Sequence, residues 1–169
     1  MFYFQKSLKY LEQDSLVNIK QRGSIYANIA MIFNETSNSE QYLYFLKKSL
    51  KEALKSKDST QLSMAYNNIG VYYENSGNYN EALNTYKKAL CYSELNKFLL
   101  FQNIGSIYLN LSKRDSAKYY LFKAIRNSKD SSITALTYYN LSRLENPVQK
   151  KIEYLQNAEL FLSKKSFRS

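Results

Sequence analysis

Apolar residues recur with the period of an α-helix on both sides of a short polar break within residues 63–90. Before the break they stand at positions i, i+3, i+4 and i+7, and after it they again share one helical face. The break itself is the polar segment Glu74–Asn78. The pattern predicts two amphipathic helices joined as a hairpin, with apolar faces formed by Tyr66, Ile69, Gly70 and Tyr73, and by Tyr79, Ala82, Leu83, Tyr86, Ala89 and Leu90.

Small residues within these two faces indicate how closely the helices approach. Gly70 costs about 1 kcal/mol relative to alanine inside a helix, so its presence indicates that another backbone comes very close at that point. Ala82 and Ala89 leave similar room on the second helix. The sequence therefore predicts a helical hairpin whose halves interlock through small side chains.

These residues resemble the tetratricopeptide repeat, a helix–turn–helix unit of about 34 residues. The family pattern has a large residue, then Leu-Gly and Tyr, and in the second helix Ala, an aromatic residue and Ala. Here those places hold Tyr66, Ile69-Gly70, Tyr73, Ala82, Tyr86 and Ala89, with Gly77 at the turn. The resemblance implies an all-α fold, a right-handed α-solenoid of such hairpins, which serves as a non-catalytic scaffold for binding proteins or peptides.

The same register extends along residues 1–169, which we interpret as one domain. Four hairpins are expected, at about residues 16–56, 60–93, 95–128 and 131–163. The place of Gly70 recurs at Ala30, Gly105 and Ser142. In the last unit, Val148, Leu155 and Ala158 are expected to continue the apolar pattern, with Lys151 in the place of the first alanine.

Residues 1–13 align with the second helix of the following unit, so they are expected to be the second helix of a preceding repeat. Such a helix has no first helix to cover its apolar face. We therefore expect the chain to be a fragment of a larger protein. Resemblance to tyrosine- and asparagine-rich bacterial members of the family implies the sensory or regulatory portion of a signalling protein.

Catalysis has little support in this sequence, which contains no histidine and one cysteine, Cys91. There is no glycine-rich phosphate loop and no cluster of metal-ligating residue types, so neither an enzyme, a cofactor nor a metal is predicted. No apolar run reaches about 18 residues and no secretory signal opens the chain. These observations leave the compartment open between the cytoplasm and the periplasm.

Side chains on the first helices line the concave surface in this family, and the register gives candidates for that groove. Asparagine immediately precedes the Ile or Leu of the motif in all four units, and an amide can both donate to and accept from an extended peptide backbone. The alternative is that these asparagines bond neighbouring helices. The groove candidates are Asn28, Met31, Met64, Asn67, Asn68, Val71, Gln102, Asn103, Ser106, Tyr139, Asn140 and Arg143.

The net charge of +10 is concentrated outside these positions. Lys-Lys pairs fall on the second helices, where a solvated outer face is expected, and the predicted groove contains a single cation, Arg143. The lysines and asparagines of the family's carboxylate clamp are missing, and the groove holds too few cations to neutralise phosphates. A protein or peptide partner is therefore predicted rather than an acidic chaperone tail or a nucleic acid. Self-association through the terminal helices is the main alternative.

Overall fold

The computed structural model describes residues 19–166 except 94–96, 127, 129 and 146. The helix expected over residues 1–13 lies outside the described part. Within it, all regular structure is α-helical, and the helices are α2 (Ile19–Glu35), α3 (Ser39–Ser56), α4 (Ser59–Asn75), α5 (Tyr79–Tyr92), α6 (Lys97–Asn110), α7 (Arg114–Ile125), α8 (Ser131–Ser142) and α9 (Val148–Ser166).

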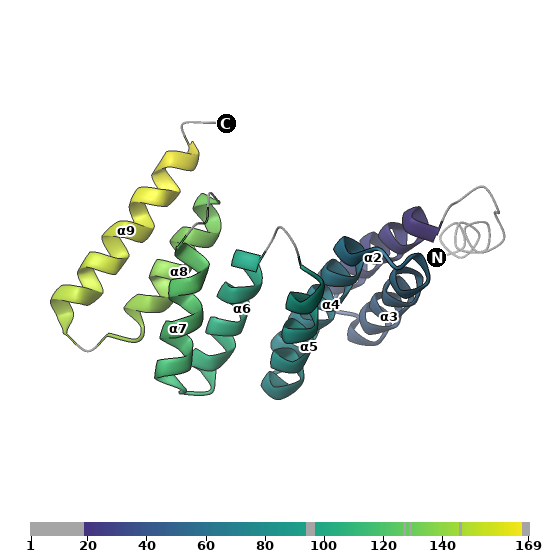
Figure 1. Ribbon diagram of the computed structural model, residues 1–169, viewed down its shortest axis with the longest axis horizontal. Coiled ribbons are helices and arrows are strands. Elements are labelled where there is room, and N and C mark those ends of the chain that lie inside the picture. The colour runs from purple at the N-terminus through teal and green to yellow at the C-terminus, as the bar shows by residue number, and fades with distance from the viewer. Residues whose placement is uncertain (1–18, 94–96, 127, 129, 146, 167–169) are drawn as a thin grey trace.

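Consecutive helices pair as antiparallel hairpins, and the hairpins follow one another in chain order along the long axis (Figure 1). The most extensive contacts join α2 with α3, α4 with α5, α6 with α7 and α8 with α9. Each hairpin then meets the next through its second helix, as α3 contacts α4, α5 contacts α6 and α7 contacts α8. The all-α solenoid of helical hairpins expected from the sequence is confirmed.

The turns inside the first three hairpins share one geometry. A single residue adopts a left-handed conformation, with φ of 56° at Ser37, 73° at Gly77 and 57° at Ser112. The next N–H donates to the carbonyl five residues back, as Asn78 does to Tyr73 over 2.9 Å. This pattern closes each first helix with a Schellman motif and starts the second helix directly afterwards.

In each of the second and third hairpins, the two helices pack tightly against each other at a glycine of the first helix. A β-carbon added to Gly70 would lie 2.5 Å from the ring of Tyr86, and one added to Gly105 would lie 2.7 Å from Leu121. Tyr86 and Leu121 are fully buried. The close approach predicted at Gly70 is therefore present, but the group that fills the space is the Tyr86 side chain, not another backbone.

The register expected for the last hairpin is wrong by one turn of its second helix. Lys151, Leu155 and Val148 are exposed, whereas Ala158 is buried and Tyr154 packs with Leu141. Tyr154 follows Ser142 by 12 residues, the spacing that also separates Gly70 from Ala82. The spacing of the repeat is therefore kept, and a tyrosine replaces the first alanine.

Candidate functional site

The first helices of successive hairpins lie next to one another on one side of the solenoid. α2 contacts α4, α6 contacts α8, and an asparagine pair joins α4 to α6. Exposed side chains on this side come from all four helices and include Met64, which is 58% exposed, and Tyr139, which is 50% exposed. The other exposed or half-buried groove candidates are Asn28, Met31, Asn67, Asn68, Val71, Asn103, Ser106 and Arg143.

Two of the groove candidates are not accessible. Gln102 is 4% exposed and Asn140 is 3% exposed. They stand on α6 and α8, which contact each other directly, and this approach covers side chains on the facing sides of the two helices. Sequence register alone does not distinguish such positions from open ones, because it fixes the helical face but not the distance to the next hairpin.

Three asparagine side chains form a chain of amides across α4 and α6. The Asn103 amide nitrogen donates to the Asn67 side-chain oxygen over 3.0 Å. The Asn67 amide nitrogen in turn points to the side-chain oxygen of Asn68 at 3.5 Å, a long contact. Asn103 therefore bonds the neighbouring first helix, which is the alternative role considered for these asparagines. No group in the described part of the chain accepts a hydrogen bond from the Asn68 amide nitrogen, which stands at the end of this chain of amides.

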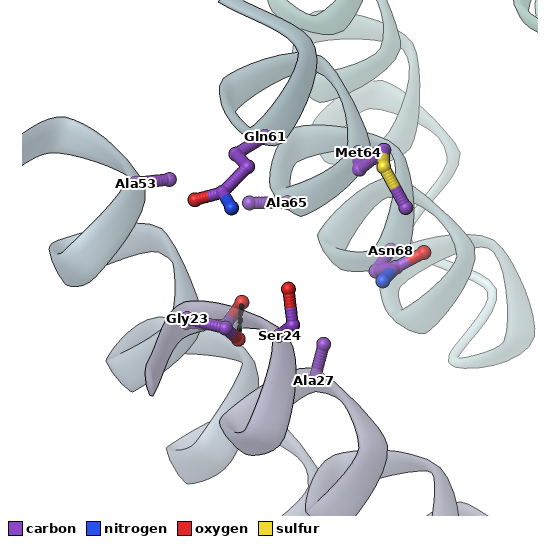
Figure 2. A pocket seen from close by; sticks show the side chains of 9 residues that line it. Gly23, Ser24, Ala27, Ala53, Gln61, Met64, Ala65 and Asn68 are labelled. Carbon is purple, nitrogen blue, oxygen red and sulfur yellow. Dashed lines mark hydrogen bonds between the residues drawn. The ribbon is translucent and has the colours of Figure 1, made fainter. Parts of the chain in front are cut away.

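A small pocket of about 40 Å³ opens beside Asn68, between α2, α3 and α4 (Figure 2). The hydroxyl of Ser49 on α3 donates to the Gly23 carbonyl on α2 over 2.9 Å and so fixes the two helices at one wall. The remaining walls consist mainly of small or flexible side chains. The lining residues are Gly23, Ser24, Ala27, Ser49, Ala53, Gln61, Met64, Ala65 and Asn68.

Sequence reasoning placed Met64 and Asn68 on this surface but did not identify the pocket. Its walls combine small residues from three helices, and no single period in the sequence marks such a combination. Gly23, a glycine inside a helix, is the signal that could have drawn attention to it.

The tetratricopeptide repeat family model matches residues 65–96, which contain most of α4 and all of α5. Residues 65–96 therefore belong to the tetratricopeptide repeat family. Similar solved structures support this fold along the whole length. BtubC (BKLC) from P. vanneervenii is 14% identical with a TM-score of 0.79, over 96% of this chain and 72% of that one.

A second similar structure is YrrB, a tetratricopeptide repeat protein described as having an unusual peptide-binding site. It is 22% identical with a TM-score of 0.60, over 98% of this chain and 85% of that one. At these identities the likeness concerns the fold alone. A search of curated protein sequences gave no significant match.

Positive charge lies mainly on the second helices of the hairpins. Lys47, Lys87, Lys88, Lys150 and Lys151 are exposed on α3, α5 and α9. Lys48 instead lies over the rings of Tyr26 and Tyr44, at 5.3 and 4.9 Å from their centroids. Lys123 occupies the equivalent place over Phe101 and Tyr119 in the third hairpin. These lysines contribute to packing outside the groove.

The described residues hold no cluster of three or more side chains suited to binding a metal ion. None of the described helices combines the length and apolar character needed to cross a bilayer. Tetratricopeptide repeat proteins are generally non-catalytic scaffolds, and the match to this family supports a protein-interaction scaffold here.

Proposed function

We propose that the groove formed by the first helices binds an extended peptide segment of a partner protein. The observation that carries this proposal is the chain of amides from Asn103 through Asn67 to Asn68. Its two ends offer complementary groups, the amide nitrogen of Asn68 as a donor and the side-chain oxygen of Asn103 as an acceptor. An extended backbone presents carbonyl and N–H groups that match both.

The side chains around these amides favour an uncharged segment. Met31, Met64 and Tyr139 are large, exposed and apolar, which suits non-polar contacts with a partner. Arg143, the C-cap residue of α8, is the cation among the groove candidates, while the lysine pairs stand on the second helices. The positive charges that would neutralise a strongly acidic peptide or a nucleic acid therefore lie mainly outside this groove.

Panning a library of random peptides against the purified chain tests the proposal. Peptides that bind should be selected, and Asn68→Ala should weaken their binding by about 5- to 10-fold, which corresponds to one lost hydrogen bond. Asn84→Ala is the matched control, because Asn84 is exposed on the second helix α5, away from the groove. Failure to select any peptide, or equal losses in the two variants, would exclude the groove as the binding site.

A sensory or regulatory role within a larger bacterial signalling protein stays a prediction from family resemblance. The binding groove is compatible with that role but does not require it. Sequencing the genomic region around the reading frame tests it, because a neighbouring kinase, membrane or DNA-binding module in the same frame would support it.

Self-association is a second candidate, favoured by the outer face of α9. Val148, Ile152, Leu155 and Leu162 are all exposed and stand at i, i+4, i+7 and i+14, the a and d spacing of a coiled coil.

Sedimentation velocity distinguishes this candidate from a monomer. A dimer that Leu155→Lys converts to monomer, and that Leu54→Lys leaves intact, would support pairing through α9. Leu54 is a suitable control because it is similarly exposed, at 50% against 42% for Leu155, but on α3. A monomer at all accessible concentrations would exclude self-association.

A further inference from the structure

We infer that the pocket between α2, α3 and α4 selects one short, uncharged, β-branched side chain, valine or threonine, of the bound peptide. This inference rests on the proposed peptide-binding function. It adds a site of selection to a groove that otherwise contacts the peptide backbone and makes non-polar contacts.

The volume of the pocket limits which peptide side chains can enter it. Its volume is about 40 Å³, well below the roughly 150 Å³ of a cavity that holds a benzene ring, so only a side chain of a few non-hydrogen atoms fits. Valine and threonine side chains each have three such atoms. Leucine, isoleucine and the aromatic residues have more, and alanine would leave most of the space empty.

The chemistry of the pocket walls favours an uncharged peptide side chain. Ala27, Ala53 and Ala65 line the pocket with methyl groups, and no charged side chain is among the lining residues. Figure 2 shows these alanines arranged around the open space, with the Gln61 amide and the Ser24 hydroxyl also directed toward it. An ionised side chain would lose its hydration there without a counter-charge, which is unfavourable.

The position of Asn68 links the pocket to the peptide backbone. Asn68 lines the pocket and also ends the chain of amides that begins at Asn103. Its amide nitrogen is therefore placed to donate to the carbonyl of the residue whose side chain enters the pocket. In an extended peptide the neighbouring side chains point the opposite way, so one residue in the segment is selected while its neighbours vary.

Packing keeps the pocket open when no peptide is bound. Ser49, Ala53 and Ala65 are buried in the contact between α3 and its neighbours, and the Ser49–Gly23 hydrogen bond ties α3 to α2. Ala53 and Ala65 belong to one buried cluster with Leu62. The walls therefore come from the packed parts of three helices, so the shape of the pocket persists without a ligand.

Peptides selected from a random library, resynthesised with glycine, alanine, valine, threonine, leucine or phenylalanine at each position in turn, test the inference. At one position valine and threonine should bind best. Alanine should bind about tenfold more weakly than valine, because two fewer carbon atoms are buried. Leucine and phenylalanine should lose at least as much through steric clash.

The variant Ala27→Leu fills the pocket and provides the decisive comparison. It should abolish the preference for valine over alanine at that position, while the dependence on Asn68 persists. Thermal unfolding followed by circular dichroism checks that the variant is folded, and Asn34→Leu, exposed on the same helix but neither a groove candidate nor a pocket residue, is the matched control.

The possible results separate the inference from the proposed function. Peptides that bind through Asn68 but show no position selective for valine or threonine, or that keep the selectivity in Ala27→Leu, would overturn the pocket and leave the groove standing. If no peptide is selected at all, both the groove and the pocket are wrong.

Discussion

The ring of Tyr86 occupies the space into which a side chain on Gly70 would project. A β-carbon at Gly70 would lie 2.5 Å from Cε1 and 2.6 Å from Cδ1 of that ring. Tyr86 is fully buried, and its hydroxyl donates a 2.6 Å hydrogen bond to Glu74 on the facing helix. Burial raises the pKa of the Tyr86 hydroxyl, and the nearby Glu74 raises it further. The neutral ring is thus fixed in place, and Gly70 is required by packing.

Gly70→Leu is therefore expected to lower the free energy of unfolding by about 3 kcal/mol through overpacking. Urea unfolding followed by circular dichroism measures it. Gly23→Ala is the control, because a β-carbon at Gly23 meets its nearest neighbours at 3.5 Å, an ordinary contact. That change should be neutral or stabilise the chain by up to about 1 kcal/mol through helix propensity. Equal stability of the two variants would contradict the close contact at Gly70.

The left-handed turn residues predict a stabilising substitution. Ser112 has φ of 57° in the same turn position where Gly77 has φ of 73°. A β-carbon is unfavourable in this conformation, so Ser112→Gly should raise the free energy of unfolding by about 0.5–1 kcal/mol. Gly77→Ser should lower it by a similar amount, because the space around Gly77 is open and only the backbone conformation is affected. Opposite shifts of the melting temperature would support this account, and shifts of the same sign would argue against it.

An ion pair at the junction of the third and fourth hairpins predicts a pH dependence. The Lys118 ammonium lies 2.7 Å from the Glu145 carboxylate, and Arg114 donates to the carbonyl of Leu144 beside it. The hydrogen bond from Lys118 lowers the pKa of Glu145 below its usual value. A carboxyl whose pKa is lower in the folded state stabilises the fold above the pKa of the unfolded chain. This contribution is lost as the pH falls through the folded-state value.

Lys118→Met should therefore destabilise the chain near neutral pH by less than about 1 kcal/mol, since Lys118 is 37% exposed. The difference from the wild type should vanish at pH values below the folded-state pKa of Glu145. Unfolding by urea at a series of pH values measures it. A difference that is the same at neutral and acidic pH would mean that Lys118 acts through packing and not through its charge.

The sequence predicted the all-α class and the helices well, because the apolar period, the small residues and the turn signals agree there. The polar break predicted at residues 74–78, for example, covers the end of α4 at Asn75 and the turn before α5 begins at Tyr79. In the last hairpin, the expected register put Lys151 in the place of the first alanine, whereas the contact of Tyr154 with Leu141 shows that the 12-residue spacing from Ser142 holds there. The pocket was not predictable, since it depends on distances between three helices.

The asparagines at the groove give the last prediction, which separates their structural and binding roles. Asn103→Ala removes the 3.0 Å hydrogen bond to Asn67 and should lower the free energy of unfolding by about 1 kcal/mol. Asn68→Ala removes only a 3.5 Å contact and should leave stability nearly unchanged while weakening a selected peptide. Because the amides polarise one another, the two losses in peptide affinity should not add in the double variant. Fluorescence anisotropy of a labelled peptide measures this, and unaltered binding in all three variants would assign the asparagines to helix packing alone.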